Sequence, residues 1–104
     1  MKIWKIAQAS SLMYYVDTES RGILLTPDPS FANHESDQVA VFILRHGEYY
    51  NPHKTFMNIT DDDANKLKNM GFLGVILGDY ILIFEIEAMK RVGKYDFNQK
   101  IVIW

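Results

Sequence analysis

One segment of this chain carries a complete set of helix signals, and it most constrains the fold. Thr60 can accept hydrogen bonds from the backbone amides of a first turn, and Asp63, three residues later, completes a capping-box pattern. The aspartates Asp61-Asp62-Asp63 oppose the positive end of a helix dipole. These residues predict a helix over 60–70 and favour a structural role for the aspartates over a metal-binding one.

The end of the predicted helix is marked as well. Gly71 can adopt the left-handed conformation that follows a last helical turn, and Phe72 can then contact Leu67. Ala64, Leu67 and Met70 fall on one side of the helix. We expect this side to cover one face of a sheet.

The remaining apolar runs are short and rich in β-branched residues, which is typical of strands. With a single helix visible, the fold class is α+β: a mainly antiparallel sheet of about five to seven strands with the helix packed on one face. The length predicts one small domain spanning residues 1–104. Strands are expected at residues 2–7, 12–16, 23–25, 38–44, 73–77, 80–88 and 100–104, with another short strand or an extended connection at 54–59.

Two of these strands carry further expectations. The continuous apolar run Val39–Leu44 is typical of a central strand that is covered on both faces. Gly78-Asp79 suits a two-residue hairpin turn between strands 73–77 and 80–88. In the second arm the even-numbered residues are expected in the core, and Glu85 and Glu87 are expected to face solvent.

Composition and charge exclude several classes of protein. The net charge of −2 supplies no strongly basic field, so duplex nucleic acid is not expected as a partner. The chain has no cysteine, which excludes disulfides and thiolate metal sites. Neither a secretory signal nor an apolar run long enough to span a membrane is visible. A cytoplasmic setting is therefore expected, which would be the host cytoplasm for a viral protein.

One stretch contains a catalytic signature. The sequence Phe42-Ile-Leu-Arg-His-Gly-Glu-Tyr-Tyr-Asn51 resembles the motif of the histidine phosphatase (phosphoglycerate mutase-like) superfamily. The resemblance implies that His46 attacks phosphorus and that Arg45 holds the phosphate oxygens. An imidazole nucleophile needs such a neighbouring guanidinium group to attract and stabilise an anionic substrate.

The resemblance covers ten residues of 104. The family needs a second arginine, a proton-donating carboxylate and a second histidine farther along the chain. After Asn51 this chain has one histidine, His53, only two positions on, and one arginine, Arg91. Its parallel sheet also needs several crossover helices, and one helix is visible here. The sequence therefore favours a binding role over catalysis.

The same stretch concentrates hydrogen-bond donors and aromatic rings that suit an anionic ligand. Guanidinium, imidazole and ammonium groups bind phosphate, and tyrosine rings can stack on a base. A nucleotide-like anion is the natural small ligand, and an ordinary polar loop is the alternative. The candidate ligand-binding residues are Arg45, His46, Tyr49, Tyr50, His53 and Lys54.

The chain has more aromatic residues than a small core readily covers. Trp4, the pair Tyr14-Tyr15 and Trp104 are therefore candidate interface residues, and a homo-oligomer is expected. The three histidines have no recognisable metal-ligand spacing. No metal site, no catalytic residue and no cofactor is predicted.

Three hypotheses follow. The first is a non-enzymatic binding protein, a homo-oligomeric inhibitor or sponge-like module that sequesters a nucleotide-like anion or a protein partner. Phage-borne inhibitors of host defence are an analogy of size and composition only. The second is a phosphoryl-transfer enzyme that uses His46. The third is a structural or assembly module that makes protein contacts only.

Overall fold

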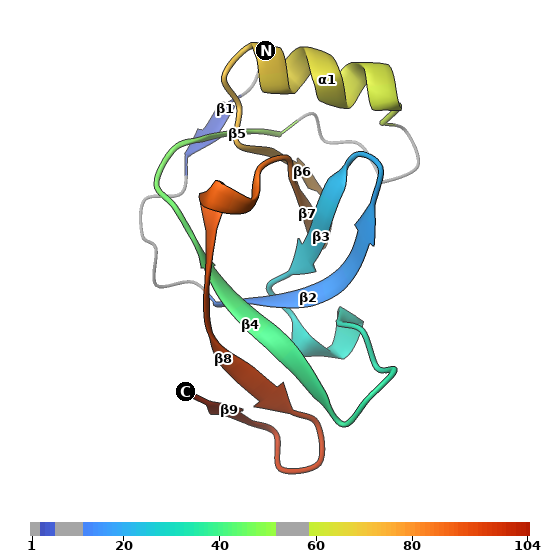
Figure 1. Ribbon diagram of the computed structural model, residues 1–104, viewed down its shortest axis with the longest axis vertical. Coiled ribbons are helices and arrows are strands. Elements are labelled where there is room, and N and C mark those ends of the chain that lie inside the picture. Colours follow the sequence, from blue (N-terminus) through green and yellow to red (C-terminus); the bar gives the residue numbers. More distant parts are fainter. Residues whose placement is uncertain (1–2, 6–11, 52–58) are drawn as a thin grey trace.

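The computed structural model describes residues 3–5, 12–51 and 59–104. These ranges contain one α-helix, nine strands and two short 3₁₀ helices, η1 (Pro29–Phe31) and η3 (Ile86–Ala88) (Figure 1). The helix is α1 (Asp61–Asn69). The strands are β1 (Ile3–Lys5), β2 (Leu12–Glu19), β3 (Gly22–Thr26), β4 (Gln38–Leu44), β5 (Glu48–Tyr50), β6 (Gly74–Leu77), β7 (Tyr80–Ile83), β8 (Met89–Asp96) and β9 (Ile101–Ile103).

The nine strands form one sheet in the order β1-β5-β6-β7-β3-β2-β4-β8-β9. The pairs are antiparallel except for β5 and β6, which are parallel. The α+β class with a mainly antiparallel sheet is confirmed. The expected five to seven strands were too few, because β5 and β8 were not predicted. The strand or extended connection expected at 54–59 lies, except for Ile59, outside the described residues.

The expected helix is confirmed at both ends. The Thr60 hydroxyl accepts from the Asp63 amide at 3.1 Å, and the Asp63 carboxylate accepts from the Thr60 amide at 3.3 Å, which closes the capping box. The Phe72 amide donates to the Leu67 carbonyl at 3.1 Å, with Gly71 at φ 95°. One expectation was wrong: Met70, which follows the last residue of α1, is 59% exposed and does not join Ala64 and Leu67 in the core.

The hairpin is also confirmed. β6 and β7 pair antiparallel, and the pair Leu77–Tyr80 lies next to the turn. Its second arm is shorter than expected, because β7 ends at Ile83 and η3 follows. The expectation that only its even-numbered face is core was wrong, since Ile81, Leu82 and Ile83 are all buried. β7 lies within the sheet and has core on both of its faces.

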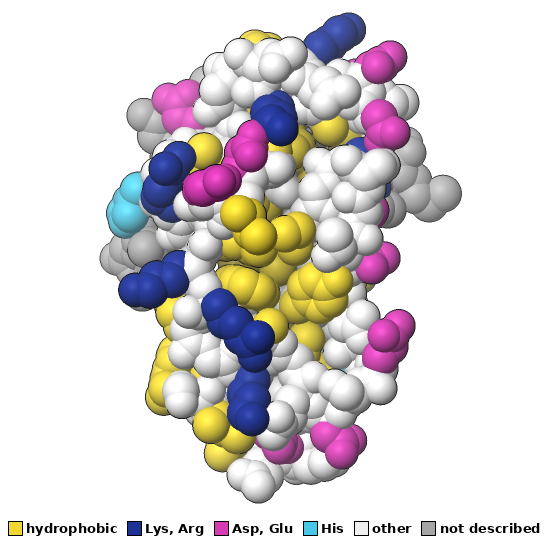
Figure 2. All heavy atoms as spheres, in the orientation of Figure 1, with side chains coloured by type: hydrophobic (Ala, Val, Ile, Leu, Met, Phe, Trp, Pro, Cys, Tyr) yellow, Lys and Arg dark blue, Asp and Glu magenta, His cyan; other side chains and the backbone are white. Residues whose placement is uncertain are grey.

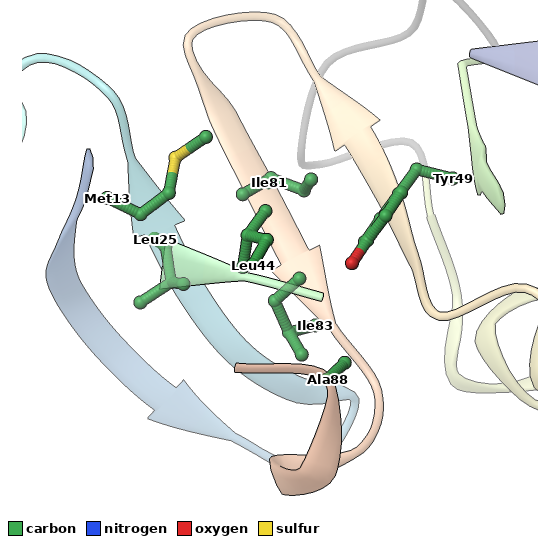
Figure 3. Close-up of a cluster of buried hydrophobic side chains, with 7 residues drawn as sticks. All are labelled: Met13, Leu25, Leu44, Tyr49, Ile81, Ile83 and Ala88. Atoms are coloured by element: carbon green, nitrogen blue, oxygen red, sulfur yellow. The ribbon is translucent and has the colours of Figure 1, made fainter. Parts of the chain in front are cut away.

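Three groups of buried side chains make up the core. The central cluster lies where the sheet curls on itself, with side chains from five strands and η3 converging (Figure 3). The helix-side cluster packs Leu67 and Phe72 against β6 and β7. The β4 cluster joins Val39 and Val41 to Tyr14 and Ala32.

β4 contributes to two of these clusters. Val39 and Val41 belong to the β4 cluster, whereas Leu44 belongs to the central cluster and Phe42 packs against it. Core thus lies on both faces of β4, although at different points along the strand. β4 is an interior strand, as expected, because it pairs with β2 on one side and β8 on the other. Within the described residues, no helix is long and apolar enough to cross a membrane.

Candidate functional site

The end of β4 delivers two of the predicted ligand-binding residues to the surface. Arg45 and His46 follow Leu44 directly, and both side chains are exposed. The backbone of Arg45 is held on two sides: its amide donates to the Ala88 carbonyl at 2.7 Å, and its carbonyl accepts from the Tyr49 hydroxyl at 2.7 Å. The position of Arg45 at the end of β4 is therefore well defined.

A pocket of about 390 Å³ opens beside these two residues. Its floor is apolar and is formed by Ile43, Leu44 and Met89. β4 and β8 pair Leu44 with Met89 and Ile43 with Lys90, so both strands contribute to the lining of the pocket. This volume lies within the range of about 300–1,000 Å³ that is usual for small-molecule sites.

The rim of the pocket carries four polar side chains from three elements. Arg45 and His46 come from the end of β4, Lys90 from β8, and Glu87 from η3. Figure 2 shows Lys and Arg side chains, a histidine and acidic side chains near one another at the left side of the molecule. The rim combines cationic donors with one carboxylate acceptor above an apolar floor.

Sequence reasoning missed Lys90 and Glu87 as pocket residues. Lys90 lies in β8, a strand that was not predicted. Glu87 was expected on the solvent face of a long strand shared with Glu85, but both residues follow the end of β7. Glu87 is exposed at the pocket, and Glu85 pairs with Lys68 of α1 at 3.0 Å. No local signal in the sequence relates these positions to Arg45.

The two tyrosines of the predicted group point away from each other. Tyr49 is fully buried in the central cluster, and burial raises its pKa to about 12. Tyr50 packs on the other face, with its ring centroid 5.6 Å from that of Phe72. The two rings separate because adjacent strand residues face opposite sides of a sheet. Neither ring lines the pocket. His53 and Lys54 lie outside the described residues.

The histidines of the described chain are far apart. His46 follows the end of β4, whereas His34 stacks on Phe97 at a centroid distance of 4.2 Å. Phe97 donates its amide to Asp37, directly before β4, so His34 lies at the opposite end of this strand. The length of β4 separates the two by roughly 20 Å. In residues 3–5, 12–51 and 59–104, no group of three His, Asp or Glu side chains could hold a metal ion.

The four candidate interface residues lie in different environments. Tyr14 is buried, and its ring contacts Tyr95 edge-on at 5.3 Å, so it serves the core. Tyr15 is half-buried, and its hydroxyl hydrogen-bonds with that of Thr18 at 2.8 Å. Trp104 is 76% exposed. Trp4 lies in β1 opposite Tyr49, and its side chain is outside the described part of the chain.

Comparisons with protein-family models, with curated proteins and with solved structures found no match for this chain.

Proposed function

We propose that this protein is a non-enzymatic binding protein, and that the pocket between β4 and β8 holds a small nucleotide-like anion. The observation that carries the proposal is the convergence of Arg45, His46 and Lys90 around one apolar floor. These side chains come from two strands and meet through the pairing of β4 with β8. Cationic donors at a concave apolar site suit a ligand that has a charged end and a flat or apolar body.

The carboxylate of Glu87 narrows the ligand class. It lines the same pocket as the three basic groups, so a uniformly anionic ligand would meet one repulsive group. A nucleotide avoids this conflict, because its phosphate can bind the basic groups while an amino or hydroxyl group donates to Glu87. A purely inorganic polyanion fits less well.

The surroundings of His46 support binding rather than phosphoryl transfer. The histidine phosphatase motif that this stretch resembles works together with a second histidine and a second arginine around the same phosphate. Of the described histidines, only His46 lies at the pocket, and Arg91 donates its Nε hydrogen to the Gly93 carbonyl at 3.4 Å. Binding without turnover would let the protein sequester its ligand.

Isothermal titration with mononucleotides, dinucleotides and cyclic nucleotides tests the proposal. We expect at least one of them to bind, and we expect Arg45→Ala and Lys90→Ala each to lose about 1.5–3 kcal/mol of binding free energy, the usual value of a hydrogen bond to a charged group. Lys66→Ala is the matched control, because Lys66 is an exposed lysine of α1 outside the pocket. Equal losses in all three variants would contradict this site.

A phosphate-release assay on the same panel separates binding from catalysis. We expect no turnover by the wild-type protein. Turnover that disappears in His46→Ala would replace the binding proposal with the phosphatase-like alternative. If the panel gives neither heat nor turnover, the protein-contact hypothesis is favoured instead.

A further inference from the structure

A bulge in the pairing of β4 with β8 changes which side chains of β8 share a face. The register shifts between Val41 and Phe42, because β8 has one extra residue, Val92, at this point. In a regular strand, residues three positions apart face opposite sides of the sheet. The bulge therefore places Arg91 and Lys94 on the same face.

Apolar side chains lie beside these two cations. Arg91 is opposite Phe42 of β4. Lys94 lies between Ala40 of β4 and Ile103 of β9. Residues that pair across an antiparallel ladder project from the same side of the sheet. Figure 2 shows a row of Lys and Arg side chains next to an uncovered area of hydrophobic side chains.

A second aromatic ring on this face comes from β2. Tyr14 pairs with Val41, so the next residue, Tyr15, shares the side of the sheet that Phe42 occupies. Tyr15 and Phe42 are half-buried and pack against the central cluster. The Tyr15 hydroxyl lies at an exposed position. We call this surface the basic-aromatic face, and it consists of Tyr15, Ala40, Phe42, Arg91, Lys94 and Ile103.

The two cations of the basic-aromatic face are available to a ligand. Within residues 3–5, 12–51 and 59–104, neither Arg91 nor Lys94 forms a salt bridge. Arg91 donates its Nε hydrogen to a backbone carbonyl of its own strand, which leaves the terminal guanidinium nitrogens for a ligand. Asp96, two residues beyond Lys94, is 8% exposed and already accepts from Gln38 and from two backbone amides of the following turn.

The spacing of these groups indicates the class of ligand. Phe42 and Ala40 are two residues apart on β4, so the pairs that carry Arg91 and Lys94 are about 7 Å apart. A ligand that fits has successive anionic groups joined to flat, apolar groups. Single-stranded nucleic acid has this construction, because its phosphates follow one another and its bases can stack on aromatic rings.

We infer that the basic-aromatic face binds single-stranded nucleic acid, with phosphates at Arg91 and Lys94 and bases against the rings of Phe42 and Tyr15. The net charge of −2 argues against a duplex, whose binding is dominated by charge, whereas a single strand also gains from stacking. The inference is independent of the β4–β8 pocket, because none of the residues of this face lines that pocket.

Fluorescence anisotropy with a labelled dodecanucleotide tests the inference. DNA and RNA strands are titrated separately, and binding of either one supports it. Arg91→Gln and Lys94→Gln should each weaken binding about tenfold, because each removes a charge-assisted hydrogen bond to phosphate. Each should also reduce the slope of log K against log salt concentration by about 0.7, the value for one phosphate contact on a single strand. A residue with only a structural role would not change this slope.

Lys66→Gln is the matched control, because it removes the same charge from an exposed lysine of α1. It should change neither the affinity nor the slope, and equal losses in all three variants would overturn the inference. The same strand annealed to its complement should bind more weakly than the free strand. Equal affinity for strand and duplex would overturn the inference, as would a wild-type protein that binds neither. A glutamate peptide that competes as well as unlabelled strand does would assign the face to an acidic protein instead.

Discussion

The hydroxyl of Tyr49 donates a 2.7 Å hydrogen bond to the carbonyl oxygen of Arg45. This bond ties β5 to the end of β4 across the Gly47 turn. It is formed inside the central cluster, into which the Tyr49 ring points (Figure 3). One buried side chain thus contributes to the core and fixes the backbone from which Arg45 extends to the pocket.

Tyr49→Phe should destabilise the protein by about 0.5–1.5 kcal/mol, the usual net value of an intramolecular hydrogen bond. The ring remains to fill the core, so the loss reflects the hydroxyl alone. Denaturant titration measures it. Tyr15→Phe is the control, because its hydroxyl bonds to Thr18 at an exposed position, and a smaller loss is expected there. Equal losses would mean that the buried bond to Arg45 stabilises the fold no more than the exposed bond to Thr18 does.

Alkaline pH should weaken the fold through the same residue. Burial raises the pKa of Tyr49 from 10.0 to about 12, so the folded protein keeps a proton that the unfolded chain releases. This contribution to stability is complete below pH 10 and declines as pH rises toward about 12. Unfolding free energies measured across this interval should fall less steeply in Tyr49→Phe than in the wild type. Parallel curves would contradict the assignment.

Thr60→Ala should cost about 0.5–2 kcal/mol of stability, because it removes the hydroxyl that accepts from the Asp63 amide. Thermal or denaturant unfolding gives the value. Asn65→Ala is the matched control: Asn65 is exposed in the same helix, and alanine has the higher helix propensity. The control should be neutral or slightly stabilising. An unchanged midpoint in Thr60→Ala would show that the cap does not stabilise the fold.

Gly93→Ala should destabilise the protein and loosen β9. A Cβ atom at Gly93 would lie 2.3 Å from the backbone oxygen of Ile103, so the two strands would have to separate. We expect a loss of about 1–3 kcal/mol, as for other overpacked sites. Amide hydrogen exchange in β9 should also become faster.

Gly47→Ala is the comparison for this substitution. Its added Cβ would meet the Leu73 side chain, also at 2.3 Å, and a side-chain end can move more easily than paired backbone. A larger loss in Gly47→Ala than in Gly93→Ala would contradict the proposed reason for glycine in β8.

The local elements of this protein could be read from the sequence. The helix depends on Thr60, Asp63, Gly71 and Phe72, all of which act on backbone groups within a few residues. The hairpin turn at Gly78-Asp79 is equally local. Such signals can be recognised without the tertiary structure, because their hydrogen bonds and contacts join residues that are close together in the chain.

The formation of strand β8 and the different environments of Tyr49 and Tyr50 depend on the tertiary structure alone. β8 carries Lys90, Arg91 and Lys94 among few apolar residues, so no strand was predicted there. Its Gly93 is required by the approach of Ile103, which no local pattern reveals. Tyr49 and Tyr50 are adjacent residues of the same type. Because side chains alternate along a strand, Tyr49 lies in the central cluster and Tyr50 packs against the helix-side cluster.

The candidate site divides in the same way. Arg45 and His46 could be identified from the sequence, because they end an apolar strand at a glycine turn. Lys90 and Glu87 joined them only through the register of β4 with β8, across more than forty positions of the chain. The sequence specifies the chemistry of each side chain. Which charged side chains share a pocket depends on strand pairing, and strand pairing depends on the packing of the whole sheet.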